Sequence, residues 1–288
     1  MILLENENII VAFSPQGAEL RSIKSKVTEL DYLWKGDPAF WGKFSPVLFP
    51  IVGALKNNQY RYEGQTYELS RHGFARDYEF QTTQINEGEV LFSLSSNAET
   101  LKVYPFEFQL ALRYKITGSK VSCSYEITNP SEKNLLFSIG GHPAFAAPLT
   151  KDTAYEDYYL EFAEDDAITF YKIDSNLISE QTETLHLEDK KLPLKHSLFY
   201  DDALVFKNLK SEKITLKNTQ NTHGLSFRFP GFPFFGIWAA KDADFVCLEP
   251  WCGIADGVNH NQELSDKEGI ISLSPGQPWG RTWEVEVF

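Results

Sequence analysis

Apolar and polar residues alternate along most of the chain in short segments, and turn-forming residues separate one segment from the next. Residues 106–116 and 121–128 show the pattern well, because Thr117-Gly118-Ser119 joins two alternating segments. Such a pair is typical of an antiparallel hairpin. The same alternation recurs in residues 60–62, 66–69, 78–84, 90–94, 135–137, 203–206, 214–216, 225–229, 235–239, 245–248 and 283–288. The pattern predicts an all-β protein built from antiparallel hairpins and meanders.

Helical signals are few. Residues 97–102 predict one short helix with Asn97 as its N-cap. Residues 150–200 are richer in charge and less regular than the rest, which we interpret as a long insertion on the β-structure. Because no Ser- or Gly-rich linker, repeat or low-complexity block divides the chain, we expect one domain, residues 1–288, with the architecture of a large antiparallel β-sandwich.

The composition narrows the possible partners. Of the 288 residues 42% are hydrophobic and 23% are charged, so the chain can bury a substantial core. Aromatic residues make up 14%; they suit pleated sheets and also stack on sugar rings. The formal net charge of −13 repels phosphates and anionic lipids, so we expect neither nucleic acid nor membrane as a partner. A homodimer is compatible with this composition.

The cysteines and the start of the chain indicate the cytoplasm. The three cysteines are few, odd in number and without metal-site spacing, which is typical of a reducing compartment. The first residues have no basic region and already carry Glu5 and Glu7, unlike a signal peptide. The longest uncharged stretch, residues 134–150, is interrupted by glycines, prolines and a histidine, so it predicts no membrane span.

Two histidine segments look unlike ordinary strand-and-turn sequence. In Ser70-Arg71-His72-Gly73-Phe74-Ala75-Arg76, two cations and an imidazole flank a small residue; a salt-bridged surface loop is the alternative interpretation. In Gly140-Gly141-His142-Pro143, paired glycines and a proline constrain the backbone, so His142 is presented in a defined direction. A buried histidine bonded to a backbone carbonyl is the alternative there.

A third segment places a carboxylate in apolar surroundings. In residues 245–252 an apolar strand ends at Glu249, between Leu248 and Pro250 and close to Trp251. Glutamate is rarely buried unless it is paired or reactive, and partial desolvation would raise its pKa towards the range of a general base. A structural carboxylate that caps a loop is the alternative.

Other kinds of site have less support. The chain has no G-x-S-x-G, P-loop or G-x-G-x-x-G motif, which argues against hydrolase-elbow and nucleotide folds. Two histidines and a glutamate can bind zinc, but H-E-x-x-H is absent and the ligands come from three separate segments, so we expect no metal. The remaining histidines lie in polar surroundings and are expected at the surface: His186, His196, His223 and His260.

Taken together and in this order, the three segments resemble the aldose 1-epimerase (galactose mutarotase-like) family, and in detail its LacX-like branch, which is related to hexose-6-phosphate mutarotases. Matching stretches run over nearly the whole chain and include residues 45–53, 100–108 and 202–206. The combination of RHGFAR, GGHPAF and LEPW at these separations is specific, whereas each motif alone is weak. The resemblance implies a galactose mutarotase-like β-sandwich with its site on the concave face.

The resemblance also implies roles for the three residues. Glu249 matches the general base that removes the proton from the C1 hydroxyl of the sugar, and His142 the general acid that protonates the ring oxygen. His72 matches a second histidine that assists at the ring oxygen and holds the sugar. Rotation about C1–C2 and closure of the ring then exchange the anomers, and this acid–base chemistry needs no cofactor.

Substrate contacts follow the family less closely. Where galactose mutarotases carry an arginine, this chain has Gly53-Ala54-Leu55-Lys56, and Arg76 matches a substrate contact of the sugar-phosphate branch. With Arg71, it could pair with a sugar phosphate. Asp202 lies near the position of a hydroxyl-binding aspartate, and Trp238 offers a stacking face or a core residue. A neutral hexose and a hexose phosphate are both compatible with this set.

Three functions therefore fit the sequence. The first is a mutarotase that interconverts the α and β anomers of a hexose or hexose phosphate. The second is a non-catalytic protein that binds or senses carbohydrate on the same fold. The third, a glycoside-active enzyme, requires a second carboxylate opposite Glu249, for which the chain offers Asp202 without a strong motif.

Overall fold

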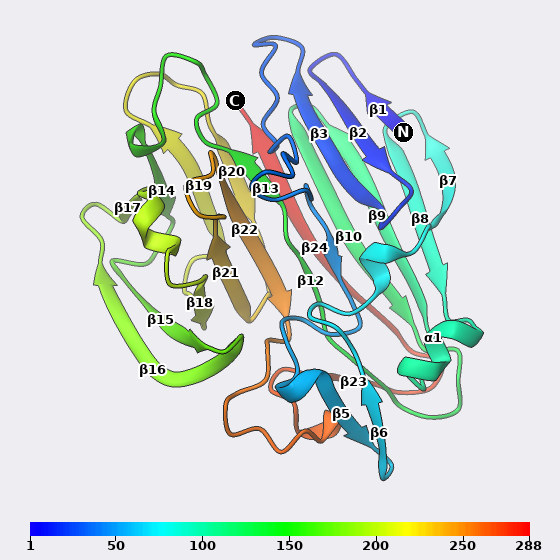
Figure 1. The fold of residues 1–288 in the computed structure, drawn as a ribbon. Helices are drawn as coiled ribbons and strands as arrows, with labels where there is room; N and C mark the ends of the chain where they lie inside the picture. The colour runs from blue at the N-terminus through cyan, green and yellow to red at the C-terminus, as the bar shows by residue number, and fades with distance from the viewer.

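The computed structural model describes residues 1–288 and consists mainly of antiparallel strands in two packed layers (Figure 1). This confirms the predicted all-β sandwich. The back layer is one nine-stranded sheet. Its strands, in spatial order, are β17 (Lys191–Pro193), β14 (Tyr158–Phe162), β19 (Lys213–Asn218), β20 (Leu225–Arg228), β24 (Pro278–Val287), β10 (Lys120–Thr128), β9 (Gln109–Thr117), β8 (Glu89–Ser95) and β7 (Gln81–Asn86).

The second layer contains an eight-stranded sheet and a three-stranded sheet. The eight-stranded sheet follows the order β16 (Leu177–His186), β15 (Ala167–Asp174), β18 (Leu204–Lys207), β21 (Phe234–Trp238), β22 (Phe245–Cys252), β12 (Ile139–Gly141) and β4 (Val47–Leu48), and β13 (Ala144–Ala146) also pairs with β22. The three-stranded sheet is formed by β1 (Ile2–Glu5), β2 (Ile9–Ser14) and β3 (Glu19–Ser25).

Two small ladders and a few short helices complete the fold. The ladders pair β5 (Gln59–Tyr62) with β6 (Gln65–Glu68), and β11 (Leu135–Phe137) with β23 (Ile271–Leu273). The α-helix is α1 (Ala98–Val103). The 3-10 helices span Lys56–Asn58, Ala75–Asp77, Tyr155–Asp157, His196–Phe199 and Leu264–Asp266. No helix is long and apolar enough to cross a membrane.

The predicted hairpin and the predicted helix are found where the pattern put them. The turn at residues 117–119 joins β9 and β10, whose alternate side chains are buried, as a sheet with one face on the core requires. Helix α1 begins at the predicted cap, since the Asn97 side chain accepts hydrogen bonds from the backbone N–H groups of Glu99 and Thr100.

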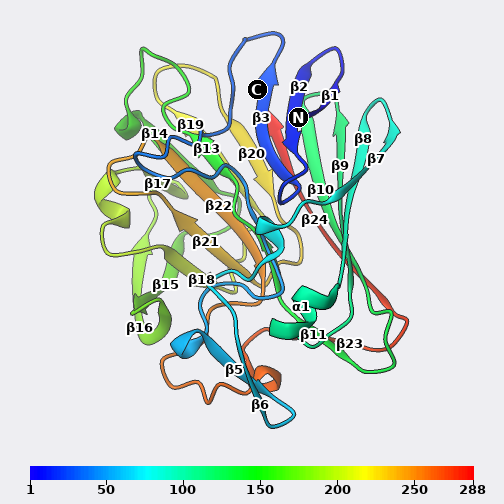
Figure 2. The ribbon, with the colours of Figure 1, turned by 45° about the vertical axis from the view of Figure 1, so that its right-hand side comes forward.

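Aromatic side chains fill the space between the layers. The ring centroid of Phe227 in the nine-stranded sheet lies 6.3 Å from that of Phe235 in the eight-stranded sheet, and the ring centroid of Phe229 lies 4.2 Å from that of Phe235. Figures 1 and 2 both show β1–β3 alongside β8–β10, and Phe13 packs there at 4.6 Å from Tyr114. The nine-stranded sheet is therefore covered by two separate sheets that share one core.

The interpretation of residues 150–200 as an insertion is wrong. Strand β14 lies inside the nine-stranded sheet, between β17 and β19, and the hairpin β15–β16 forms one edge of the eight-stranded sheet. These residues look irregular because β16 is an edge strand, and most of its side chains are exposed to water. Polar residues are tolerated at such an edge and hide the alternation of a buried strand.

A buried ion pair holds the chain after β22. Lys267 Nζ lies 2.8 Å from Asp256 Oδ1, and both side chains are fully buried. The other carboxylate oxygen of Asp256 accepts a hydrogen bond from the backbone N–H of Lys56. The pair therefore ties the segment after β22 to the segment before β5.

We predict that replacing Lys267 with Met lowers the free energy of unfolding by about 3–5 kcal/mol, because Asp256 would be left as an unpaired buried charge. The matched control is Lys133→Met, since Lys133 pairs with Glu63 at the exposed surface and should contribute little. Urea unfolding followed by tryptophan fluorescence measures both variants. A loss in Lys267→Met no larger than that of the control would contradict the prediction.

Candidate active site

The candidate site lies on the face of the eight-stranded sheet turned away from the nine-stranded sheet. In β21, Phe235 packs against Phe227 of the opposite sheet, so the neighbouring residue Gly236 faces outward. Gly236 pairs with Glu249 of β22, which therefore shares this outer face. The expectation that the strand ends at Glu249 is wrong, because β22 continues to Cys252 and Glu249 lies in its middle.

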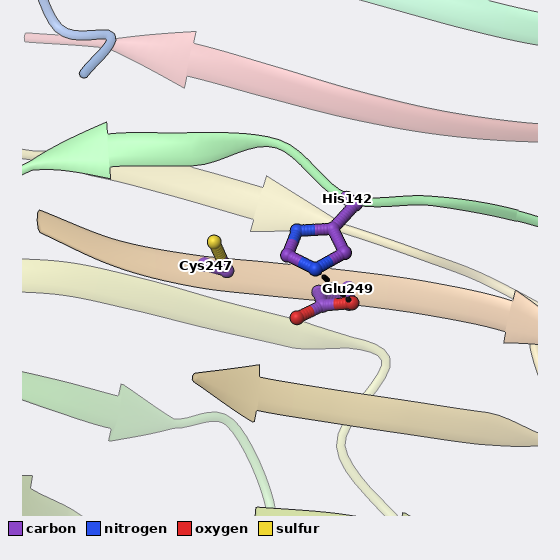
Figure 3. Close-up of side chains that lie close together, drawn as sticks. All are labelled: His142, Cys247 and Glu249. Atoms are coloured by element: carbon purple, nitrogen blue, oxygen red, sulfur yellow. Dashed lines mark ion pairs between the residues drawn. The ribbon is translucent and has the colours of Figure 1, made fainter. Parts of the chain in front are cut away.

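A gap in strand pairing brings His142 to Glu249. On one side of the gap, Gly140 of β12 pairs with Trp251; on the other, Ala144 of β13 pairs with Cys247. The two pairs have the same register. If this register is continued across residues 141–143, His142 lies opposite Glu249. His142 Nε2 lies 3.3 Å from Glu249 Oε2, and Figure 3 shows the imidazole directed at the carboxyl group.

His72 is held in an unusual backbone conformation. Its φ is +70°, in the left-handed region that few non-glycine residues adopt. Gly73 follows with φ +68°, and a Cβ there would lie 2.3 Å from the carbonyl oxygen of Phe49. The backbone N–H of Gly53 donates to His72 Nδ1 at 3.1 Å, and the backbone N–H of His72 donates to the carbonyl of Gly53. An acceptor at Nδ1 leaves the proton of the neutral ring on Nε2.

All seven candidate site residues predicted from the sequence line one cavity of about 460 Å³. They come from the loop before β7, the β12–β13 gap, the loop before β18, and strands β21 and β22: Arg71, His72, Arg76, His142, Asp202, Trp238 and Glu249. The His72 and His142 rings meet edge to face at 5.8 Å. Residues that lie up to 178 positions apart in the chain therefore share one pocket.

Sequence reasoning missed four further residues that line this cavity: Trp41, Asp201, Ala203 and Trp251. Trp41 matters most, because its ring stacks on His142 with centroids 4.9 Å apart and lies 5.7 Å from Trp238. Its loop is fastened by a hydrogen bond from Trp34 Nε1 to the carbonyl oxygen of Trp41. No motif surrounds Trp41, so only the folded chain relates it to His142.

The two arginines lie at the rim of the cavity. Arg71 is exposed, forms no ion pair and donates from Nη1 to Asn176 Oδ1 at 3.1 Å, in the turn between β15 and β16. Arg76 is partly buried; it donates to the carbonyl oxygen of Arg71, and its Nε lies 3.9 Å from Asp77 Oδ2. Arg71 can therefore turn its charge towards a ligand without breaking a salt bridge.

Burial disfavours charge on the three central groups. It raises the pKa of Glu249 well above its ordinary value, and it lowers the pKa of His142 to about 3. The pKa of His72 is also well below its usual range, first because of burial and then because His142, Arg71 and Arg76 are close. Burial therefore favours the neutral form of each of the three groups.

One group of side chains has the composition of metal ligands. His142 Nε2, Cys247 Sγ and a Glu249 carboxylate oxygen all lie within 4.8 Å of one another (Figure 3). A metal requires the thiolate and the carboxylate, whereas burial raises the pKa of both groups well above their ordinary values. His142 and Glu249 are also already in contact with each other. These residues fit acid–base chemistry better than a metal.

The expectation for the other histidines is only partly right. His186 is exposed, but His260 is largely covered and lies 3.3 Å from Asp256. His196 stacks on Tyr155 with centroids 4.0 Å apart, and it lies near two carboxylates. Polar neighbours in the sequence did not indicate exposure here, because an imidazole among polar neighbours can still be packed against an aromatic ring.

Comparison with known proteins identifies the family. The protein-family model described as aldose 1-epimerase matches residues 1–286 of this chain. The chain belongs to the aldose 1-epimerase family. Two proteins from Lactococcus lactis subsp. lactis, the chromosomal and the plasmid form of Protein LacX, are each 36% identical over 297 residues, which cover 100% of this chain and 99% of theirs. The predicted resemblance is therefore confirmed.

Two solved structures, each 33% identical to this chain, have the same fold. A galactose mutarotase related enzyme from Lactobacillus acidophilus has a TM-score of 0.95 at 33% identity, covering 100% of this chain and 97% of that one. A galactose mutarotase-like protein from Lactobacillus casei has a TM-score of 0.93 at 33% identity and covers both chains completely. The eight-stranded sheet and its gap therefore belong to a galactose mutarotase-like fold.

The lowered pKa of His142 predicts how stability depends on pH. An unfolded histidine titrates near 6.5, so between that pH and about 3 the folded chain binds fewer protons at His142 than the unfolded chain. The contribution of His142 to the free energy of unfolding should therefore fall as the pH is lowered through this window, by at most about 1.4 kcal/mol per pH unit. The raised pKa of Glu249 contributes with the opposite sign, so the comparison with a His142 variant isolates the contribution of His142.

Urea unfolding between roughly pH 4 and pH 7 tests this prediction. His142→Asn should flatten the dependence by up to one proton, whereas His186→Asn, which changes an exposed imidazole, should follow the wild-type protein. Identical slopes for the wild type and His142→Asn would show that His142 titrates normally in the folded chain.

Proposed function

We propose that this protein is a cofactor-independent mutarotase, an isomerase that interconverts the α and β anomers of a hexose or hexose phosphate. The observation that carries the proposal is the buried contact between His142 and Glu249 in an aldose 1-epimerase family member. Ring opening of a sugar needs one proton removed from the C1 hydroxyl and one added to the ring oxygen. A paired base and acid in one pocket supply both.

Glu249 and His142 act as this base and acid. In the reactive form the Glu249 carboxylate accepts the C1 hydroxyl proton while protonated His142 gives its proton to the ring oxygen. The C1–O5 bond breaks, and an open-chain aldehyde forms. Rotation about C1–C2 exposes the other face of the aldehyde, and the reverse proton transfers close the ring. No atom or electron is gained or lost over the cycle.

Burial favours this direction of proton transfer. Before ring opening the pair consists of an imidazolium and a carboxylate, which the pocket disfavours; afterwards both groups are neutral. A strongly acidic imidazolium and a strongly basic carboxylate thus react together, and each becomes the form that burial prefers. The resting pair reaches the reactive form by moving one proton along the 3.3 Å contact.

His72 and the aromatic residues hold the sugar in this scheme. Neutral His72 carries its proton on Nε2 and offers it as a hydrogen bond to the ring oxygen, while Nδ1 stays bonded to Gly53. Asp202 lines the same cavity and accepts hydrogen bonds from sugar hydroxyls. Trp238 gives the ring an apolar face, and Trp41 keeps the His142 imidazole in its orientation.

Glu249→Gln and His142→Asn should each lower the rate constant of anomer exchange by about 10²- to 10⁴-fold, because each removes one proton-transfer group. Two-dimensional exchange NMR at the anomeric protons measures this rate with hexoses at equilibrium. Glu87→Gln and His186→Asn change exposed residues of the same types and should leave the rate unchanged. Unaltered exchange in the two pocket variants would refute these roles, and saturable binding of sugar without faster exchange would identify a binding protein instead.

The arginines predict how a phosphate would be recognised. If a hexose 6-phosphate is the substrate, Arg71→Gln should lower its kcat/KM by about 10- to 100-fold, because a hydrogen bond to a charged group is lost. For the neutral hexose the same variant should change kcat/KM far less. Comparing a panel of hexoses with their 6-phosphates measures both, and Arg61→Gln, an exposed arginine outside the cavity, is the control. Equal losses for neutral and phosphorylated sugars would argue against a phosphate contact.

A further inference from the structure

The indole of Trp251 lies on the same face of the eight-stranded sheet as Glu249. Both residues belong to β22 and are two positions apart, so their side chains point to the same side of the sheet. Trp251 is buried, and it lines the candidate cavity. It also belongs to a small buried cluster that includes Leu48, Val205 and Ile254. One part of the ring therefore packs in this cluster, and another part borders the cavity.

Two glycines make room for this ring. A Cβ at Gly140 would lie 2.6 Å from Trp251 Cδ1, and Gly140 is the cross-strand partner of Trp251 in β12. A Cβ at Gly236 would lie 2.5 Å from Cζ2 and Cη2 of the same ring, and Gly236 is the partner of Glu249 in β21. The indole thus extends diagonally across β22 from position 251 towards position 249. Nε1 lies on the ring edge between Cδ1 and Cζ2, so this edge carries the N–H to the level of the Glu249 side chain.

The indole N–H of Trp251 is buried and forms no hydrogen bond in this structure. Two other tryptophans do use theirs. Trp34 Nε1 donates to the carbonyl oxygen of Trp41, and Trp283 Nε1 donates to the hydroxyl of Tyr125, each at 2.8 Å. A buried donor without an acceptor is unfavourable, so such groups are rare in native structures and often have a functional reason.

The carboxyl group of Glu249 is the acceptor that this N–H can serve. Its Oε2 contacts His142 Nε2 at 3.3 Å. Burial is the main cause of the raised pKa of Glu249, and the charge of Arg71 and then the N–H of Trp251 act against it. Asp202 adds to the rise. The N–H is therefore close enough to act on the carboxyl group without being bonded to it. Hydrogen bonds to catalytic groups are often long in the unliganded protein and tighten when charge develops.

We propose that Trp251 is a positioning residue, whose N–H bonds to the Glu249 carboxylate in the reactive form of the site. The inference rests on the proposed mutarotase function, in which this carboxylate accepts the proton of the C1 hydroxyl. Burial disfavours the carboxylate, and a charge-assisted hydrogen bond from the indole offsets part of this effect. Once the carboxylate has taken up the proton, the bond weakens again. Trp251 thus acts through Glu249 and increases the fraction of the protein that is ready to react.

Removing the N–H tests this role. Trp251→Phe should lower kcat for anomer exchange by about tenfold or more, because a hydrogen bond to a charged group is lost, and should change KM less than about twofold. The analogue 3-benzothienylalanine at position 251 keeps the bicyclic ring, replaces the N–H by sulfur and should cause a similar loss. Trp279→Phe removes an indole outside the cavity and should change neither constant. A wild-type kcat with the sulfur analogue would overturn the proposal, since the shape of the ring would then be sufficient.

The pH profile distinguishes this role from a structural one. The reactive pair holds one proton, so the rate should fall at high pH as this proton is lost with the pKa of Glu249. In Trp251→Phe the carboxylate is less stable, so this pKa rises further and the high-pH limb should move to higher pH. His142, Arg71 and Asp202 are the same in both proteins. A variant with a loosened fold would react more slowly but keep the limb in place, and that result would contradict the proposal.

Carbon-13 NMR of the Glu249 carboxyl carbon separates this inference from the proposed function, and Glu249→Gln assigns its signal. If the wild-type protein does not accelerate anomer exchange, the mutarotase proposal fails, and the titration of this carbon alone decides the role of Trp251. A higher pKa of Glu249 in Trp251→Phe than in the wild type and in Trp279→Phe would still support a bond from the N–H to the carboxylate. Equal pKa values in the three proteins would refute it.

Discussion

The site depends on one constraint, the common register of β12 and β13 along β22. Two short strands pair with the same partner, and residues 141–143 have no partner on β22. Had the pairing continued, the side chain at position 142 would face position 249 as an ordinary cross-strand neighbour. The interruption keeps this relation and frees the backbone around His142 from the ladder. His142 and Glu249 thus meet through sheet geometry, and the position of neither depends on a long loop.

The surrounding sheet determines the environment of that pair. Every residue of β22 is buried, and Glu249 is only 2% exposed. In such a medium neither an isolated carboxylate nor an isolated imidazolium is favoured, so a proton shared by the two is favoured on the carboxyl group, where it leaves both groups neutral. The arginines stay at the rim, where water still reaches Arg71. The pocket therefore combines a buried centre, which holds His142 and Glu249, with an edge where the charged side chain of Arg71 is exposed to water.

Much of the fold was predictable from the sequence because alternation reports directly on a half-buried strand. It succeeded for β9 and β10, which are long and have one face on the core. It failed for β15 and β16, whose exposed edge carries polar residues on both faces. The end of β22 was also misjudged, since Pro250 is tolerated inside a strand where the neighbouring pairing is interrupted.

The candidate site was predictable only in part. His72, His142 and Glu249 stand out through glycine, proline and apolar neighbours, and the family resemblance supplied their roles. Trp41 could not be found in this way, because its importance lies in a stacking contact across 101 positions of sequence. A cavity between the β15–β16 hairpin and β18 could not be predicted either, because the sequence did not identify this hairpin as part of the sheet.

The gap between β12 and β13 also bears on how this protein can change in evolution. Surface loops accept insertions and deletions readily. In contrast, the insertion of one residue between Gly140 and Ala144 would shift β13 by one position against β22. Phe145 would then turn from the core towards the outer face, and Ala144 would take its place. Chain length should therefore vary among related proteins almost anywhere except in this stretch, whose length is fixed by the packing on both of its sides.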